Sequence, residues 1–276
     1  MIRTTYAQRA EIRKKLTPEI RWENEKIWTY LVADLLDQAR DQGPLFSMLC
    51  GEGARCAQRL DLWFEAEPLS PRKGTPGVDH ESNTKIDLAF GAIRQRTTTA
   101  SGIEYDEAAP HSWACFVEGK HIRRDCDFMS TYDPLRNQLE RDIESLLCFQ
   151  KDGHFPARMY FILLTPRLLK NNPRARLYGY RMSEYLAERN RVVEDIERCR
   201  ISPRDNLGQQ YPDVRERVRD LTLRWVSYED ILEQSLGQAP IDMLDPGPTP
   251  ELEERFHEIA GVLGESDTDE TMTREE

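Results

Sequence analysis

Three charged residues stand inside segments that otherwise have the composition of buried strands. Asp87 lies within Lys85–Phe90, and Glu118 and Lys120 lie within Trp113–Lys120. Side chains alternate between the two faces of a strand, so Glu118 and Lys120 share one face. Burying an acid or a lysine is costly unless the charge is paired or holds a metal ion. These residues therefore predict a polar centre where two adjacent strands end.

The spacing of Glu118 and Lys120 is by itself weak evidence for a functional site. The chain has 49 acidic residues, and an acid two positions before a lysine arises by chance in a chain of this composition. The weight comes from the apolar segment around the pair and from the second acid, Asp87, in an upstream strand. An alternative stays open, in which these charges form only a structural ion pair between neighbouring strands.

Hydrophobic periodicity predicts the elements that would position these residues. Asp133-Pro134 offers a cap and a first-turn proline for a helix, which would cross over between the third and fourth strands. The first three strands can form a meander, so the predicted fold class is α/β, with a mixed central sheet flanked by helices. The predicted order is a helix over 17–40, strands over 59–69, 85–94 and 112–121, a helix from 133 to 153, and a strand over 158–165.

With these elements in place, the chain resembles the PD-(D/E)XK nuclease superfamily, which has the restriction-endonuclease-like fold. The superfamily pattern is a helix, a three-stranded meander, a helix and a strand, with Asp on the second strand and Glu-x-Lys on the third. The matching residues are Ile86-Asp87 and Glu118-Gly119-Lys120, and the resemblance spans about residues 19–167. Ile86 departs from the pattern, because the family often has Pro at this position.

The resemblance implies a role for each of the matching residues. Asp87, Glu118 and the carbonyl of Gly119 would bind Mg²⁺, for which Mn²⁺ can substitute, because a hard cation prefers oxygen ligands. The cation would polarise the scissile phosphate and lower the pKa of a bound water. Lys120 would orient that water or offset charge in the transition state.

Further candidates surround these residues. Glu23 lies on the apolar stripe of the first predicted helix, where many members of this fold place a Glu near the metal. Glu19 is a weaker alternative, and either could be a surface carboxylate. Gln138 lies on the helix after the third strand, where some branches have Gln followed four residues later by Tyr; this chain has Asp142 there. Gln138 could touch the site or a phosphate, or be a solvated helix residue. His121 could assist protonation or be structural.

Arginines cluster in sequence near the predicted site. Arg suits phosphate recognition because its guanidinium can donate two hydrogen bonds to one group. Each arginine alone could be a surface charge, but together they favour a basic rim that contacts nucleic acid. The set comprises Arg94, Arg96, Arg123, Arg124, Arg136 and Arg141.

The formal net charge of −11 comes mostly from the C-terminal end. Residues 245–276 contain eleven acids and two arginines, so the rest is near neutral and can present a local basic face. This tail could be a solubilising disordered end, a docking segment, or a mimic of nucleic acid. The six cysteines lack metal-site spacing, and no apolar run approaches the roughly 18–20 residues of a membrane helix, which together predict a cytoplasmic protein.

The C-terminal third predicts a helix over 183–200, an edge strand at 223–226, a short helix capped by Ser227, and a weak helix over 251–263. The predicted organisation is therefore a nuclease core over residues 1–170, a helical extension packed on it over 171–238, and a Pro-containing linker with an acidic tail over 239–276.

The resemblance implies a Mg²⁺-dependent nuclease that cuts DNA, in the setting of a prokaryotic restriction or anti-phage defence system. Such a protein could be a homodimer or work with a partner ATPase or helicase. Two other interpretations stay open. One is a catalytically inactive nucleic-acid-binding or assembly subunit that retains the fold. The other is an unrelated α/β protein in which Glu118 and Lys120 form only a salt bridge.

Overall fold

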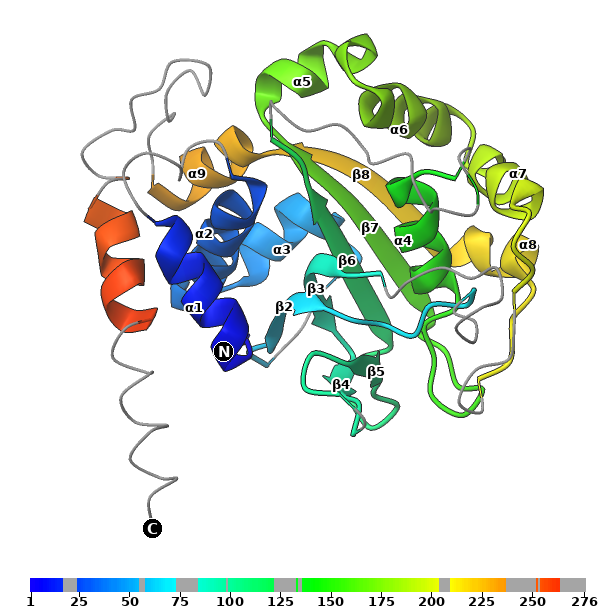
Figure 1. Ribbon diagram of the computed structural model, residues 1–276, viewed down its shortest axis with the longest axis horizontal. Helices are drawn as coiled ribbons and strands as arrows, with labels where there is room; N and C mark the ends of the chain where they lie inside the picture. Colours follow the sequence, from blue (N-terminus) through cyan, green and yellow to red (C-terminus); the bar gives the residue numbers. More distant parts are fainter. Residues whose placement is uncertain are drawn as a thin grey trace.

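The computed structural model describes residues 1–16, 24–54, 58–72, 84–97, 99–121, 133, 136–203, 209–236, 252 and 254–263. Over these ranges the chain forms an α/β fold with a mixed central sheet and helices on both faces, as the sequence predicts (Figure 1). None of the helices in these ranges has the length and apolar character needed to cross a membrane.

The central sheet follows the order β1-β2-β3-β6-β7-β8. β2, β3 and β6 form an antiparallel meander, and β7 lies parallel to β6 because helix α4 crosses over between them. β8 pairs in parallel with β7 at the edge, so the sheet continues beyond residue 170. The strands are β1 (Ile2–Arg3), β2 (Leu62–Ala66), β3 (Ile86–Gly91), β6 (Trp113–Gly119), β7 (Arg158–Thr165) and β8 (Leu221–Ser227).

Helices cover the two faces of the sheet in separate layers, and each layer buries its own apolar core. One face packs against α1 (Tyr6–Lys15), α2 (Glu25–Gln38), α3 (Gly43–Cys50) and α9 (Tyr228–Leu236). The other packs against α4 (Gln138–Leu147), α6 (Leu177–Ala187), α7 (Asn190–Arg198) and α8 (Val214–Arg217). Further helices among the described residues are α5 (Arg167–Asn171), η2 (Pro173–Ala175) and η3 (Val218–Asp220).

The position of strand β7 between the two apolar cores explains why its sequence is almost continuously apolar. Tyr160, Ile162 and Leu164 belong to the core on the α2 side, whereas Met159, Phe161 and Leu163 belong to the core on the α4 side. A strand that is covered on both faces has no solvated side to mark with polar residues.

Helix α2 begins at Glu25, later than the predicted start at Thr17. The backbone of Asn24 is extended, and its side-chain oxygen accepts a hydrogen bond from the N–H of Lys26, which is the geometry of an N-cap. Apolar periodicity therefore indicated the helix correctly, but the cap that sets its start is Asn24.

Helix α4 also begins later than the sequence predicts. Asp133 was the expected cap, but Asn137 and Glu140 form a capping box at the start of the helix. The helix ends at Leu147, before Gly153. The late start places Gln138 in the first turn of α4.

Several elements were not predicted. They include β1, α1, α3, α5, α8 and a separate hairpin of β4 (Ile93–Gln95) and β5 (Ile103–Tyr105), which begins inside the strand predicted over 85–94 because β3 ends at Gly91. The helix expected over 183–200 is two helices, α6 and α7, because α6 ends at Ala187 and α7 begins at Asn190.

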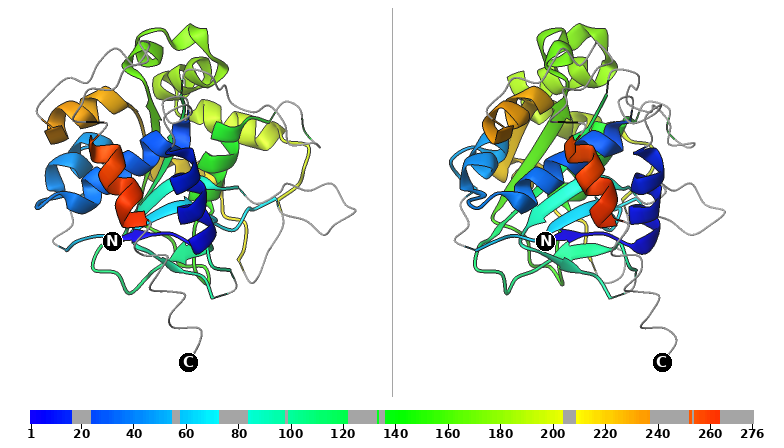
Figure 2. Two further views of the ribbon diagram at one scale, coloured as in Figure 1. Left: turned by 60° about the vertical axis from the view of Figure 1, so that its left-hand side comes forward. Right: turned by 90° about the vertical axis from the view of Figure 1, so that its left-hand side faces the viewer.

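The end of the described chain returns to the α2 side. Residues 254–263 are helical, and Phe256, Ile259 and Leu263 are buried in the same core as α2. Both views of Figure 2 show this helix beside α1 and α2. The guanidinium of Arg255 forms an ion pair with Asp34 of α2. Of the tail over 239–276, the structure describes residues 252 and 254–263, and the rest lies outside the described residues.

Candidate active site

The register of the sheet brings Asp87 and Glu118 together. Leu88 pairs with Val117 across the antiparallel strands β3 and β6, so the next position places Asp87 opposite Glu118. Residues directly opposite in such a pair have Cβ atoms roughly 4.5–5.5 Å apart. The Oδ2 atom of Asp87 accepts a hydrogen bond of 2.8 Å from the N–H of Gly119. The two predicted acids therefore meet at the end of adjacent strands.

Lys120 completes this group from the end of β6. Its Nζ donates to Oε1 of Glu118 at 2.6 Å and to Oε1 of Gln138 at 2.9 Å. Its backbone N–H donates to the carbonyl of Leu164 at 2.8 Å, which fixes the strand end against β7. Glu118 and Lys120 are buried, and Asp87 is half-buried.

The pKa values at the site reflect burial and crowding of like charges. Burial raises the pKa of Asp87 and of Glu118 well above the ordinary range, and each is raised further by neighbouring carboxylates. Burial acts to lower the pKa of Lys120, but Glu118 and the other surrounding carboxylates raise it well above its usual value. Lys120 is therefore an ammonium ion at neutral pH, held among acids.

Helix α2 contributes a carboxylate that sequence reasoning missed. Glu25 is buried in the first turn of α2, and its charge acts on Asp87, Glu118 and Lys120. The neighbouring Lys26 forms an ion pair with a β2 glutamate, which anchors this turn beside the strand ends. The signal for Glu25 was its place directly after an N-cap residue, which the early predicted helix start concealed.

Two hydroxyl groups approach the site from the same side. The Thr29 hydroxyl donates to the carbonyl of Glu25 at 3.0 Å and lies 3.4 Å from the hydroxyl of Tyr228. Both lie next to the bare Cα of Gly119, where an added Cβ would be 2.3 Å from Thr29 Oγ1 and 2.7 Å from Tyr228 Oη. The middle position of Glu-x-Lys must therefore be small in this fold.

Helix α4 approaches from the other face with Gln138 and Asp142. Gln138 binds Lys120 directly, so its side chain is part of the site, as the sequence suggested. Asp142 lies one turn further along the helix and is fully buried. Burial raises its pKa to about 7, with the charges of Arg141 and Lys120 opposing this effect. Asp142 was noticed in the sequence only as a departure from a family pattern.

His121 follows Lys120 and is buried beside α2. Its ring stacks on the indole of Trp28, with 6.3 Å between ring centroids and 8° between planes. Phe256 packs edge-on against the same indole at 5.9 Å. His121 therefore belongs to an aromatic stack that links the site to the last helix.

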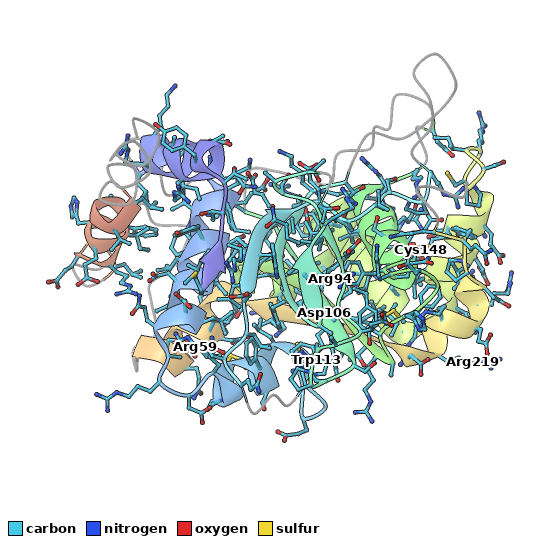
Figure 3. All side chains as sticks on the ribbon, turned by 90° about the horizontal axis from the view of Figure 1, so that it is seen from below. Arg59, Arg94, Asp106, Trp113, Cys148 and Arg219 are labelled. Carbon is cyan, nitrogen blue, oxygen red and sulfur yellow. The ribbon has the colours of Figure 1, made fainter. Side chains whose placement is uncertain are left out.

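Two arginines of the predicted basic rim, Arg94 and Arg136, lie apart from the site, whereas Arg141 of α4 acts on Asp142. Arg94 lies on the β4–β5 hairpin, which follows the far end of β3 from Asp87, and it pairs with Glu104 at 3.0 Å. Figure 3 views the protein from this end, where Arg94 is labelled. Arg136 is buried and pairs with Glu144, so it is a core residue and not part of a surface rim. Arg123, Arg124, Glu19 and Glu23 lie outside the described residues.

The donor set suits a hard divalent cation, although the side chains are not gathered around one. Among the described residues, no group of three or more His, Cys, Asp or Glu side chains is arranged to hold a metal ion. The Oε2 atom of Glu118 is nonetheless buried, and no described residue donates a hydrogen bond to it. Carboxylate and carbonyl oxygens are what Mg²⁺ and Mn²⁺ prefer, so Asp87 and Glu118 fit such an ion.

The chain matches no protein-family model, no curated protein and no solved structure. Its function must therefore be inferred from the site itself.

Proposed function

We propose that the protein is a divalent-cation-dependent nuclease that hydrolyses phosphodiester bonds in DNA. The observation that carries this proposal is the meeting of Asp87, Glu118 and Lys120 at the end of two adjacent strands, with Lys120 Nζ 2.6 Å from Glu118 Oε1. Two acids and a lysine in this arrangement supply oxygen ligands for a cation and a positive charge for a phosphate.

The topology supports the resemblance to the PD-(D/E)XK superfamily. Helix α2 precedes an antiparallel meander of β2, β3 and β6, and α4 leads to β7 in parallel with β6. Asp87 is on the second strand of this meander, and Glu118 and Lys120 are on and after the third. We propose the restriction-endonuclease-like fold on this ground, and restriction or anti-phage defence as the setting that the resemblance implies.

The cation would be held by Asp87, Glu118 and the carbonyl of Gly119. When bound, Mg²⁺ supplies a Lewis acid for the scissile phosphate and a bound water of lowered pKa. Lys120 is already positioned by Glu118 and Gln138, so its ammonium group can offset negative charge on the reacting phosphate. Asp87, which is half-buried, marks the side from which a nucleic acid can approach.

The direct test is to incubate the purified full-length protein with linear, circular and single-stranded DNA, with and without Mg²⁺. Cleavage that needs Mg²⁺ and is lost in Asp87→Asn and Lys120→Met supports the proposal. Cleavage that persists in both variants refutes the assignment of the site. An RNA substrate belongs in the same series, since the site geometry recognises the phosphodiester that both share. DNA binding without cleavage would instead indicate the non-catalytic subunit.

A further inference from the structure

Asp142 is an unusual residue for the interior of a helix layer. It is 0% exposed, and neither of its carboxylate oxygens has a hydrogen-bond donor among the described residues. A buried carboxylate without a donor is costly, and native proteins normally pair it or use it to bind an ion. Asp142 therefore needs an explanation beyond packing.

The neighbour of Asp142 is the site acid Glu118. Gln138, one turn before Asp142 on α4, binds the same Lys120 ammonium group that Glu118 binds, and the charge of Asp142 acts on Glu118. A carboxylate can only accept a hydrogen bond, so two neighbouring carboxyl groups without a donor either share a proton or bind a cation. The Oε2 atom of Glu118, like both oxygens of Asp142, has no donor in the described structure. The carboxyl groups of Glu118 and Asp142 therefore both have oxygen lone pairs that a cation could use.

The charges around this pair are unbalanced. Asp87, Glu118, Glu25 and Asp142 act on one another and on Lys120, which lies among them as a single ammonium group. Arg141 adds a second positive charge that acts on Asp142, so four acidic side chains face two cations. A further positive charge at the Glu118–Asp142 contact would correct the excess of acids.

We infer that Asp142 is a carboxylate ligand of the divalent cation at this site and binds it together with Glu118. This inference rests on the proposed function, because it takes Glu118 as a cation ligand. It extends the site from the strand ends to helix α4, which then holds Lys120 through Gln138 and the cation through Asp142. One helix turn separates these two side chains, so both face the same side.

Calorimetric titration with Mn²⁺ tests the inference on the full-length protein. Asp142→Asn keeps the size of the side chain but removes its charge, and it should weaken Mn²⁺ binding by about tenfold or more. Glu140→Gln is the matched control, because Glu140 is a buried acid of the same helix that contacts Asn137 and Tyr185 instead of the site. Unchanged Mn²⁺ affinity in Asp142→Asn overturns the inference, and so does a wild-type protein that binds no Mn²⁺.

A second variant separates a ligand from a residue that only supports the fold. Asp142→Cys supplies a soft thiolate, so the ratio of Cd²⁺ affinity to Mn²⁺ affinity should rise by at least about tenfold over that of the wild type. A residue with a purely structural role would leave this ratio unchanged, which also overturns the inference.

DNA cleavage, measured in parallel, distinguishes the two proposals. If Asp142→Asn loses Mn²⁺ affinity but no DNA is cut by the wild type, the cation ligand stands and the nuclease proposal fails. If the wild type cuts DNA and Asp142→Asn binds Mn²⁺ normally, the nuclease proposal stands and Asp142 is not a ligand.

Discussion

The carboxylate of Asp87 accepts a hydrogen bond of 2.8 Å from the backbone N–H of Gly119, the residue between Glu118 and Lys120. This bond joins β3 to β6 at the site and holds the acid beside the Glu-x-Lys segment without a bound ion. It favours the charged form of Asp87, whereas burial and the charge of Glu118 raise its pKa. The fold therefore holds the Asp87 and Glu118 carboxyl groups close together although their negative charges repel each other.

We expect Asp87→Asn to stabilise the ion-free protein while abolishing cleavage. The amide keeps an oxygen for the Gly119 N–H and removes repulsion from Glu118, so the free energy of unfolding should rise by about 1 kcal/mol. Urea unfolding in EDTA measures this change. Asp61→Asn is the control, because Asp61 is a surface acid paired with Arg3 at 2.8 Å, and its loss should change stability little. A drop in stability for Asp87→Asn would contradict the expectation.

Replacing the buried carboxylate of Glu144, in the core on the α4 side, should strongly destabilise the protein. It accepts from Arg72 Nε at 2.8 Å and from the Tyr211 hydroxyl at 2.6 Å, and it pairs with Arg136. Burial acts to raise the pKa of Glu144, but the two guanidinium groups and the hydroxyl lower it overall. Glu144→Gln would leave buried guanidinium charge uncompensated, so we expect a loss of about 3–5 kcal/mol.

Chemical denaturation of Glu144→Gln at neutral pH checks this value. Glu188→Gln is suitable for comparison, because Glu188 is exposed and pairs with Arg191 at 3.1 Å, and its loss should cost well under about 1 kcal/mol. Similar losses in the two variants would show that the network does not stabilise the core.

Glu140 should make stability depend on pH. Burial and the charge of Asp195 raise its pKa from 4.5 to about 7, with Arg136, Asn137 and Arg181 opposing. Because the folded pKa exceeds the unfolded pKa, the folded state holds a proton that the unfolded state releases. The contribution of Glu140 to the free energy of unfolding is complete below pH 4.5 and is lost as the pH rises toward 7. The total loss amounts to about 3 kcal/mol.

Glu140→Gln should remove this dependence while keeping the capping box, in which Gln can replace Glu. The free energy of unfolding of the variant, relative to the wild type, should therefore be higher at pH 7.5 than at pH 4.5. Urea titrations at several pH values between these limits measure the difference. A constant difference across the series would show that Glu140 does not titrate in this range.

Gly119→Ala should destabilise the fold at the site. The new methyl group would meet Thr29 Oγ1 at 2.3 Å and Tyr228 Oη at 2.7 Å, and overpacking of this kind costs about 1–3 kcal/mol. Thermal unfolding measures the loss. Adding Thr29→Ala removes the nearest atom and should restore part of the stability.

The control for this prediction is Gly261→Ala. Gly261 lies in the helical residues 254–263, and an added Cβ would meet nothing within 4 Å. Alanine favours a helix over glycine, so stability should stay the same or rise by up to about 1 kcal/mol. Equal losses at Gly119 and Gly261 would show that space around Gly119 is not the cause.

The sequence predicts the central elements because their patterns are local. Alternation and apolar runs identified β2, β3, β6 and β7, and the helix predicted between β6 and β7 implied the crossover. The start of α2 was wrong because apolar spacing continues upstream of Asn24, whereas the cap depends on one hydrogen bond to Lys26. The β4–β5 hairpin was missed because three-residue strands carry too short a pattern.

The sequence predicted the site residues that lie on or directly after strands, but not those that lie on helices α2 and α4, apart from Gln138. The meander makes β3 and β6 neighbours, so the sequence could bring Asp87 and Glu118 to the end of adjacent strands, whereas their register is seen only in the structure. Glu25 and Asp142 could not be placed in the same way, because their contribution depends on how α2 and α4 pack on the sheet. Arg136 looked like a surface charge, and only the tertiary structure shows its partner, Glu144.

The stack of His121, Trp28 and Phe256 gives the site an optical reporter. His121 directly follows Lys120, so a cation that draws Lys120 away from Glu118 would disturb the environment of the Trp28 indole. Tryptophan fluorescence would then register cation uptake without any added dye, and comparison with Trp28→Phe would assign the emission change to this one ring.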